Sequence, residues 1–267
     1  MSANSFTILG CAANRQVTGE DNNVTSGYVL RVGERLILFD CGGGVTGAFL
    51  RAKFDFTEVG EIFVSHTHPD HVTDLPLFLQ SIYLTWRKNP LHLFLPDDFV
   101  GPFESYMRAL YMFPETYPFE FHVTGYRGEF VHHGEGFTVR AIPNAHLSHY
   151  GERIAKFGRT NEMLSSSFLI EVDSARPGSH PHKLFYSADL ASFDEIKEHV
   201  DGCSYVLVDS THIEVDDVLS YAKDADIGAL IFTHLGDDNE IAHLREKITR
   251  SGLDRATLAE PGLTLAL

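Results

Sequence analysis

The sequence contains little cysteine and no long hydrophobic run. Its three cysteines, Cys11, Cys41 and Cys203, are widely spaced and odd in number. That pattern argues against a disulfide framework and predicts a reducing, cytoplasmic location. No apolar run approaches the roughly 18 residues that a membrane-spanning helix needs, so we expect no membrane partner. The first ten residues lack the basic and apolar regions of a secretory signal.

Basic residues are also scarce. The chain has 21 lysines and arginines against 37 aspartates and glutamates, which gives a net charge of −16. Such a charge disfavours RNA or an anionic membrane as a partner over a broad face. One local basic cluster, Arg153, Lys156 and Arg159, is suited to a small anionic group of a substrate. With 267 residues, 43% of them hydrophobic, the chain is long and apolar enough to form a large core.

The order of apolar patterns predicts a mixed α/β protein. The expected strands are residues 6–10, 27–32, 35–40, 61–65, 91–95, 167–172, 183–187, 205–209, 228–233, 256–259 and 263–266, with a strand-like stretch at 119–142. The expected helices are residues 45–54, 74–87, 97–112, 193–200, 215–223 and 240–250. We interpret residues 144–165 as a loop. The chain then reads as a single domain over residues 1–267, a two-sheet sandwich with outer helices whose α/β halves divide near residues 143–165.

Histidine is unusually frequent, with 15 residues, and three of them fall in one short segment. His66, His68, Asp70 and His71 directly follow the expected strand 61–65. Imidazole nitrogens and carboxylate oxygens suit zinc, manganese or iron. Pro69 lies inside the run and excludes a helical metal motif. In extended geometry His66 and His68 point the same way, which leaves Asp70 and His71 for a second metal.

Three further donors come just after other apolar strands, where loops gather functional residues. His146 follows residues 138–142, Asp189 follows 184–187 and His234 follows 230–233. Each alone is a weak signal, because a single histidine after a strand is commonly a surface residue. Together with the first segment they supply seven ligand-type side chains, enough for two divalent metal ions.

These residues resemble the metallo-β-lactamase superfamily, and most closely its ribonuclease Z branch. The resemblance is carried by Phe39-Asp-Cys-Gly-Gly43, Phe63-Val-Ser-His-Thr-His-Pro-Asp-His71, His146, Tyr186-Ser-Ala-Asp189 and Phe232-Thr-His234. It implies a four-layer αββα sandwich with two metal ions, most simply zinc, with manganese or iron as alternatives. It also implies that one metal is held by His66, His68 and His146, the other by Asp70, His71 and His234, with Asp189 bridging them.

Two departures separate the chain from ribonuclease Z. Where that branch carries a His-Glu-Ala-Thr run, this chain has Asp209-Ser-Thr-His212, and the loop after His234 is acidic, Leu235-Gly-Asp-Asp-Asn239. A long arm for tRNA is not evident in the sequence, and we therefore place RNA behind a small or cyclic nucleotide as the expected substrate.

The resemblance implies a hydrolase in which a metal-bridging hydroxide attacks a phosphodiester. Asp70 then binds metal and orients the hydroxide, and His212 is the candidate that protonates the leaving group. A surface or supporting role for His212 is an equal alternative, and His149 is a weaker candidate for the same proton.

Other functions use the same residues. An acyl hydrolase, such as a lactonase or thioesterase, would need the same ligands. A flavin-linked di-iron oxidoreductase would normally need a flavin domain and a carboxylate at the position of His68. A structural zinc site favours four closed ligands, often cysteines, and does not match seven His and Asp candidates. The expected partners are a small anionic or phosphodiester substrate and a second copy of the chain in a homodimer.

Overall fold

The computed structural model describes residues 4–13, 24–174 and 180–267. Within them the chain forms two compact units. Among the described residues, the first comprises residues 4–10, 24–127 and 261–266, and the second comprises residues 11–13, 128–174, 180–260 and 267. Each unit is built on one seven-stranded mixed sheet, and all strands of a sheet belong to the same unit.

The sheet of the first unit has the strand order β14-β1-β2-β3-β4-β5-β6. Its strands are β1 (Ser5–Gly10), β2 (Gly27–Val32), β3 (Arg35–Phe39), β4 (Val59–Phe63), β5 (Leu91–Pro96), β6 (Phe121–Tyr126) and β14 (Thr264–Ala266). Pairing is antiparallel from β14 to β3 and parallel from β3 to β6. The β2–β3 hairpin turns at Gly33 and Glu34, where Gly33 adopts a φ of 60° that a two-residue turn requires.

Helices of the first unit cover one face of this sheet. They are α1 (Val45–Arg51), η1 (Phe56–Glu58), α2 (Pro69–Val72), α3 (Leu75–Leu84), α4 (Asp97–Ala109) and η2 (Pro114–Thr116). Phe49 of α1, Phe78 of α3 and Phe103 of α4 are buried in one hydrophobic cluster with alternate strand residues such as Leu38 and Leu93. Alternation along the strands therefore decides which face of the sheet the helices cover.

The sheet of the second unit has the order β13-β12-β11-β10-β9-β8-β7. Its strands are β7 (Phe130–Gly134), β8 (Phe137–Pro143), β9 (Ser166–Val172), β10 (His182–Tyr186), β11 (Cys203–Asp209), β12 (Ile227–Thr233) and β13 (Ala256–Leu258). Pairing is antiparallel from β7 to β10 and parallel from β10 to β13. Because β8, β10, β11 and β12 run in the same direction, their carboxyl ends meet at one edge of the sheet.

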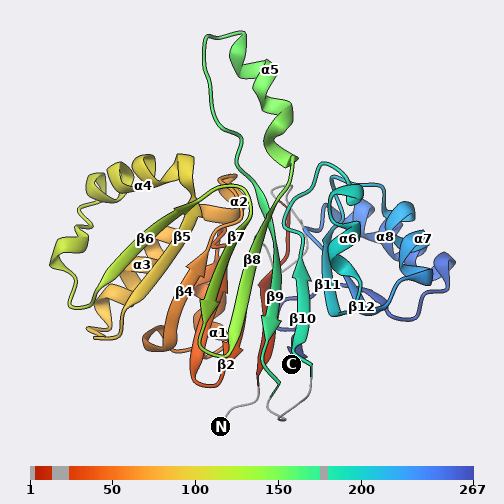
Figure 1. Ribbon diagram of the computed structural model, residues 1–267, viewed down its shortest axis with the longest axis horizontal. Coiled ribbons are helices and arrows are strands. Elements are labelled where there is room, and N and C mark those ends of the chain that lie inside the picture. The colour runs from red at the N-terminus through yellow and green to blue at the C-terminus, as the bar shows by residue number, and fades with distance from the viewer. Residues whose placement is uncertain (1–3, 14–23, 175–179) are drawn as a thin grey trace. The chain divides into compact units, whose positions relative to one another are not determined.

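The helices of the second unit are η3 (His146–His149), α5 (Tyr150–Ala155), η4 (Phe193–Glu195), α6 (Lys197–Val200), α7 (Val215–Asp224) and α8 (Asp238–Ser251). Figure 1 shows α6, α7 and α8 beside β10, β11 and β12, whereas α5 projects beyond the ends of β8 and β9. Phe157, just after α5, is 82% exposed, which fits a projecting segment with no core to pack against.

The α/β class with two mixed sheets and flanking helices is confirmed. The expectation of a loop over 144–165 is wrong, because this segment contains η3 and α5. A six-residue helix gives too short an apolar period to be recognised in sequence. The compact units divide between Arg127 and Gly128 rather than near 143–165. The single-domain description of residues 1–267 stays a prediction. Among the described residues, none of the helices combines the length and the hydropathy needed to cross a bilayer.

Candidate metal centre

In the first unit, the expected ligand segment lies where β4 gives way to α2. His66 and His68 follow the strand in extended backbone, and Pro69 begins the short helix that carries Asp70 and His71. The His66 ring lies 4.8 Å from the His68 ring and 4.1 Å from the His71 ring, measured between centroids. The structure therefore brings the three histidines of this segment together, whereas the alternating pattern predicted this only for His66 and His68.

A buried carboxylate supports this segment. Asp40, at the end of β3, lies with Oδ2 2.8 Å from Nδ1 of His71 and accepts hydrogen bonds from Ser65 N and Oγ at 2.7 and 2.9 Å. Ser65 Oγ is also 3.0 Å from Nδ1 of His66. Contacts at Nδ1 direct the Nε2 edge of each ring away from Asp40 and Ser65, and metal-binding histidines are commonly held in this way.

Glycine at position 42 lets the backbone after β3 approach the backbone of Asp70 closely. A Cβ atom at Gly42 would lie 1.9 Å from the Asp70 carbonyl oxygen, so any other residue would force the two segments apart. The Asp70 carbonyl accepts a hydrogen bond from Ser26 N, and the His71 carbonyl accepts one from Cys41 N. The glycines at 42–44 thus serve a tight turn beside the ligand segment.

In the second unit, the candidate donors follow strands that end at the same edge of the sheet. His146 comes after β8, Asp189 after β10 and His234 after β12. Oδ2 of Asp189 lies 3.5 Å from Nε2 of His146 and 3.4 Å from Nε2 of His234. All three side chains are buried. The ends of β8, β10 and β12 therefore bring three of the candidate donors together within this unit.

The backbone is strained at three of these positions. Asp40, Ala188 and His234 adopt φ values of 56°, 49° and 54°, a left-handed region that residues other than glycine rarely occupy. Such strain persists where the surroundings fix the conformation and is frequent at functional sites. Each of these residues is a candidate ligand, its hydrogen-bond partner or its immediate neighbour.

Asp209, at the end of β11, organises the turn that carries His212. Its Oδ2 atom lies 2.9 Å from Nδ1 of His212, and its Oδ1 atom accepts a hydrogen bond from Thr211 N at 2.9 Å. Asp209 Oδ1 is also 3.5 Å from Nδ1 of His234, and Thr211 Oγ1 is 2.8 Å from the same nitrogen. One buried carboxylate thereby orients two histidine rings.

The charge of this pair is fixed by its surroundings. Burial raises the pKa of Asp209, but the hydrogen bonds from His212 and His234 outweigh that effect and hold the pKa well below its usual range. Burial lowers the pKa of His212, but the hydrogen bond and charge of Asp209, with the charge of Asp189, raise it above its ordinary value. His212 is 38% exposed, so it combines a buried anchor with access to solvent.

His149, the weaker proton-donor candidate, is placed differently. Its Nδ1 atom lies 2.9 Å from the carbonyl oxygen of His146, and its ring packs 4.1 Å from the ring of Tyr150. Local contacts within η3 and α5 thus hold the His149 ring. The other proton-donor candidate, His212, has its Nδ1 atom 3.9 Å from Oδ2 of Asp189.

Glu195 is a supporting residue that the sequence analysis missed. Its Oε1 atom accepts a hydrogen bond from Ala145 N at 3.0 Å, next to His146, and Oε2 accepts one from Ala191 N at 3.2 Å, two residues after Asp189. The same glutamate completes a capping box with Ser192. The Ser-x-x-Glu spacing is a recognisable cap signal, but nothing in it indicates the bond to Ala145.

The donor set fits borderline divalent metals. Imidazole nitrogen and carboxylate oxygen are ligands for zinc, iron and manganese, and the cysteines lie outside the set. Asp189, Asp209, His212 and His234 each offer an atom within 4.8 Å of the others. In His71 and His234, Nδ1 is engaged by a carboxylate or hydroxyl, as is common for a histidine that binds metal through Nε2.

Comparison with known proteins gives one family. The model of a family described as "Beta-lactamase superfamily domain" matches residues 35–235. The ribonuclease Z of Methanosarcina acetivorans is 33% identical over 53% of this chain and 44% of that protein. The ribonuclease Z of Methanosarcina mazei is 24% identical over 80% of this chain and 82% of that protein. The match therefore spans less than half of the length of the Methanosarcina acetivorans protein.

Solved structures share the fold. The metallo-beta-lactamase fold protein YhfI from Bacillus subtilis has a TM-score of 0.74 at 19% identity and is matched over 99% of both chains. The short form of human tRNase Z has a TM-score of 0.72 at 17% identity, over 98% of both chains. At these identities the likeness shows the fold, and the expected metallo-β-lactamase fold is confirmed.

Proposed function

This chain belongs to the beta-lactamase superfamily, and on that premise we propose that it is a hydrolase that uses two divalent metal ions to cleave a phosphodiester. The observation that carries the proposal is the cluster around Asp189, where two imidazole Nε2 atoms lie within 3.5 Å of one carboxylate oxygen. Buried imidazoles that converge on a buried carboxylate are a donor set suited to a divalent cation.

The proposed ligands keep the assignment that the family resemblance implies. They are His66, His68, Asp70, His71, His146, Asp189 and His234. Asp189 is proposed as the shared ligand. Zinc is the preferred metal, because it takes nitrogen and oxygen ligands without redox chemistry, and manganese and iron fit the same donors.

The metal ions would supply a water of lowered pKa and would neutralise charge that develops on the substrate. Asp70 is proposed to bind metal and to accept the proton of the attacking water. His212 is proposed to donate a proton to the leaving oxygen. Its raised pKa favours the protonated ring, and Asp209 fixes the ring so that Nε2 carries the transferable proton.

The substrate is proposed to be a small or cyclic nucleotide. Relatives named ribonuclease Z point to phosphodiesters as a class. The net charge of −16 disfavours a large polyanion, while Arg153 and Lys156 lie on or directly after α5, the arm that follows His146. A few cations next to a ligand are enough for one phosphate group but not for an extended RNA.

The proposal is tested by metal analysis together with a matched pair of substrates. The metal-loaded protein should hydrolyse bis(4-nitrophenyl) phosphate and lose that activity after chelation. A thioester is the comparison, because an acyl hydrolase of the same fold would use the same ligands. Faster turnover of the thioester would replace the phosphodiesterase with the acyl hydrolase. No turnover of either by a protein with full metal content would contradict the proposal.

A further inference from the structure

Two adjoining cavities lie on the helical side of the second unit. One, of about 160 Å³, lies between the turn after β11 and the first turns of α8. The other, of about 200 Å³, lies between α7 and α8. Lys247 lines both of them, so the two cavities adjoin at this side chain, and together they are called the groove. None of the proposed metal ligands lines either cavity.

The second cavity is basic in an otherwise acidic chain. Lys223, Lys247 and Arg250 line it together with one acid, Asp216. His243, Lys247 and Arg250 follow one another at helical spacing on α8, so they share a face of that helix. The hydrogen bond and charge of Lys247, with the charges of Arg250 and His243, lower the pKa of Asp216.

The cations of this groove exceed the carboxylates available to them. Lys247 pairs with Asp216 at 2.9 Å. Within the described part of the chain, neither Lys223 nor Arg250 has a carboxylate partner at ion-pair distance, and Arg250 Nε makes only a long contact of 3.5 Å with the Glu246 carbonyl. A cluster of cations that the protein leaves unneutralised is suited to an anion, and an arginine is suited to a phosphate in particular.

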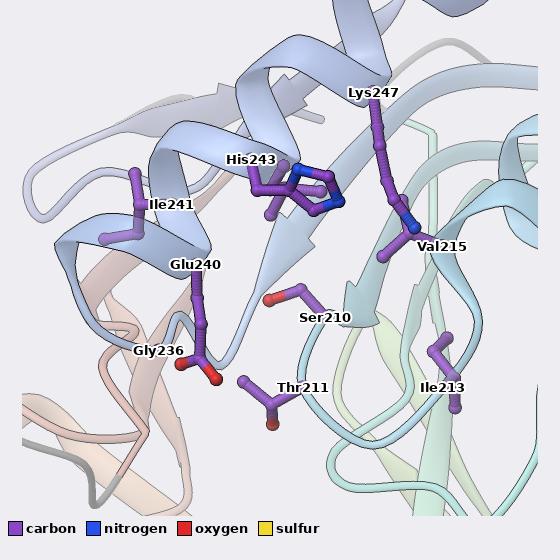
Figure 2. A pocket seen from close by; sticks show the side chains of 10 residues that line it. Ser210, Thr211, Ile213, Val215, Gly236, Glu240, Ile241, His243 and Lys247 are labelled. Carbon is purple, nitrogen blue, oxygen red and sulfur yellow. The ribbon is translucent and has the colours of Figure 1, made fainter.

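The first cavity adds a different surface. In Figure 2 the side chains of His243 and Lys247 leave α8 on the side where Ser210 and Val215 lie. Val215, Leu244 and Ile213 contribute apolar surface to this cavity, and Ser210 and Thr211 contribute hydroxyls. A ligand that extends from the basic cavity into this one would therefore carry an organic group with both apolar and hydrogen-bonding parts.

We propose that the groove between α7 and α8 binds a small organic phosphate monoester. The phosphate lies among Lys223, Lys247 and Arg250, and the organic group lies against Val215 and Leu244. This site is separate from the proposed metal centre. The two sites are linked by Ser210 and Thr211, which line the first cavity. Thr211 Oγ1 is 2.8 Å from Nδ1 of His234, and Ser210 Oγ donates a hydrogen bond to the His234 carbonyl.

A consequence for regulation rests on the proposed function. Cleavage of a phosphodiester yields a phosphate monoester, which is the class of ligand that suits the groove. A bound monoester would contact the turn at Ser210 and Thr211, which orients His234. The reaction product could in this way change the turnover rate. Binding itself does not depend on catalysis, so the test below measures binding.

The test is a titration of the full metal-loaded chain with inorganic phosphate and with adenosine 5′-monophosphate, followed by amide and methyl resonances. Phosphate bound at the metal centre also perturbs the spectrum, so the amides of Ser220 and Ser251 in the basic cavity serve as the reporters. Both ligands should shift these two amides. The monophosphate should bind more tightly and should also shift the methyl groups of Val215 and Leu244.

Variants make the result specific. The double variant K223Q/R250Q should weaken binding about tenfold, from a factor of roughly three for each surface charge removed. D216N should strengthen binding severalfold, because it removes the carboxylate that competes for Lys247; a general loss of structure cannot do this. R245Q removes a cation from the same helix but outside both cavities and should leave binding unchanged.

Three outcomes would overturn the proposal. The first is an absence of shifts at Ser220 and Ser251 when phosphate and the monophosphate are saturating. The second is equal affinity of K223Q/R250Q and R245Q. The third is binding by an oligonucleotide alone, which would make the groove an RNA surface rather than a small-molecule site. Loss of hydrolytic activity without loss of these shifts would count against the proposed function and not against the groove.

Discussion

Nδ1 of His212 lies 2.9 Å from Oδ2 of Asp209, and the aspartate is fully buried while the histidine is partly exposed. A hydrogen bond at this distance to a charged acceptor fixes the ring and stabilises its protonated form. The arrangement supplies what a general acid needs: a held proton on the buried side and an Nε2 edge available on the other.

The first prediction concerns leaving groups. His212→Ala should slow phosphodiesters with poor alkoxide leaving groups by roughly a hundredfold or more, because these need protonation. Substrates that leave as nitrophenolate should be hardly affected. Steady-state rates for the two substrate types measure the difference. An equal loss for both would indicate damaged metal geometry, and no loss for either would remove His212 from the mechanism.

The pH profile adds a second measurement on the same pair. Asp209 raises the pKa of His212, so Asp209→Asn should lower it. The protonated acid is then lost at lower pH, and the alkaline limb for a poor leaving group should move to lower pH. An alkaline limb that stays in place would mean that another group sets it.

Metal content tests the ligand assignment. We expect about two metal ions per chain, because seven donors follow the superfamily order. His68→Ala and His234→Ala should each lower the content by about one ion, since each removes a ligand of a different proposed site. Elemental analysis after gentle purification measures the content. His122→Ala, an exposed histidine on β6, is the control, and full metal content in both ligand variants would refute the assignment.

Asp70 allows a test of water activation. Asp70→Asn keeps the shape of the side chain and removes its charge, so turnover should fall by roughly a hundredfold or more if Asp70 binds metal and accepts the proton. The hydrogen bond from Ser26 N to the Asp70 carbonyl involves only backbone atoms and is retained. Asp74→Asn, a nearby carboxylate that accepts a hydrogen bond from Thr46 N, should leave turnover near wild type. Unchanged turnover of Asp70→Asn would exclude the proposed role.

Glu195 provides a test of positioning. Its two carboxylate oxygens join the backbone beside His146 to the backbone after Asp189. Glu195→Ala should weaken metal affinity by roughly tenfold, the lower end of the effects seen when a group that supports ligands is lost. Glu195→Gln should recover part of it, because the amide oxygen still accepts one hydrogen bond.

The control for this variant is Asp194→Asn in the same short helix, where Asp194 pairs with Lys197 on the surface. It should not change affinity. Competitive chelation, monitored by the absorption of a cobalt-loaded protein, measures affinity and ligand geometry together. A merely structural Glu195 would lower thermal stability while leaving the cobalt spectrum and the chelation curve unchanged.

Outside residues 144–165, most helices and strands could be predicted from the sequence, because packing against one face of a sheet sets the period of their apolar residues. Residues 75–84 and 215–224 form helices close to the expected ranges. Predictions that concern the cytoplasmic location and the homodimer stay predictions. Residues 175–179, between the expected strands 167–172 and 183–187, lie outside the described residues.

The sequence by itself determined which side chains are candidate ligands, because all of them come shortly after an apolar strand and the strand pattern is local. His66, His146 and Asp189 needed no knowledge of distant residues to be found. The tertiary structure alone decided what supports them. Asp40 reaches His71 across 31 positions, and Glu195 reaches Ala145 across 50. Such pairs leave no periodic signal, since a carboxylate acquires its partner only when remote segments meet.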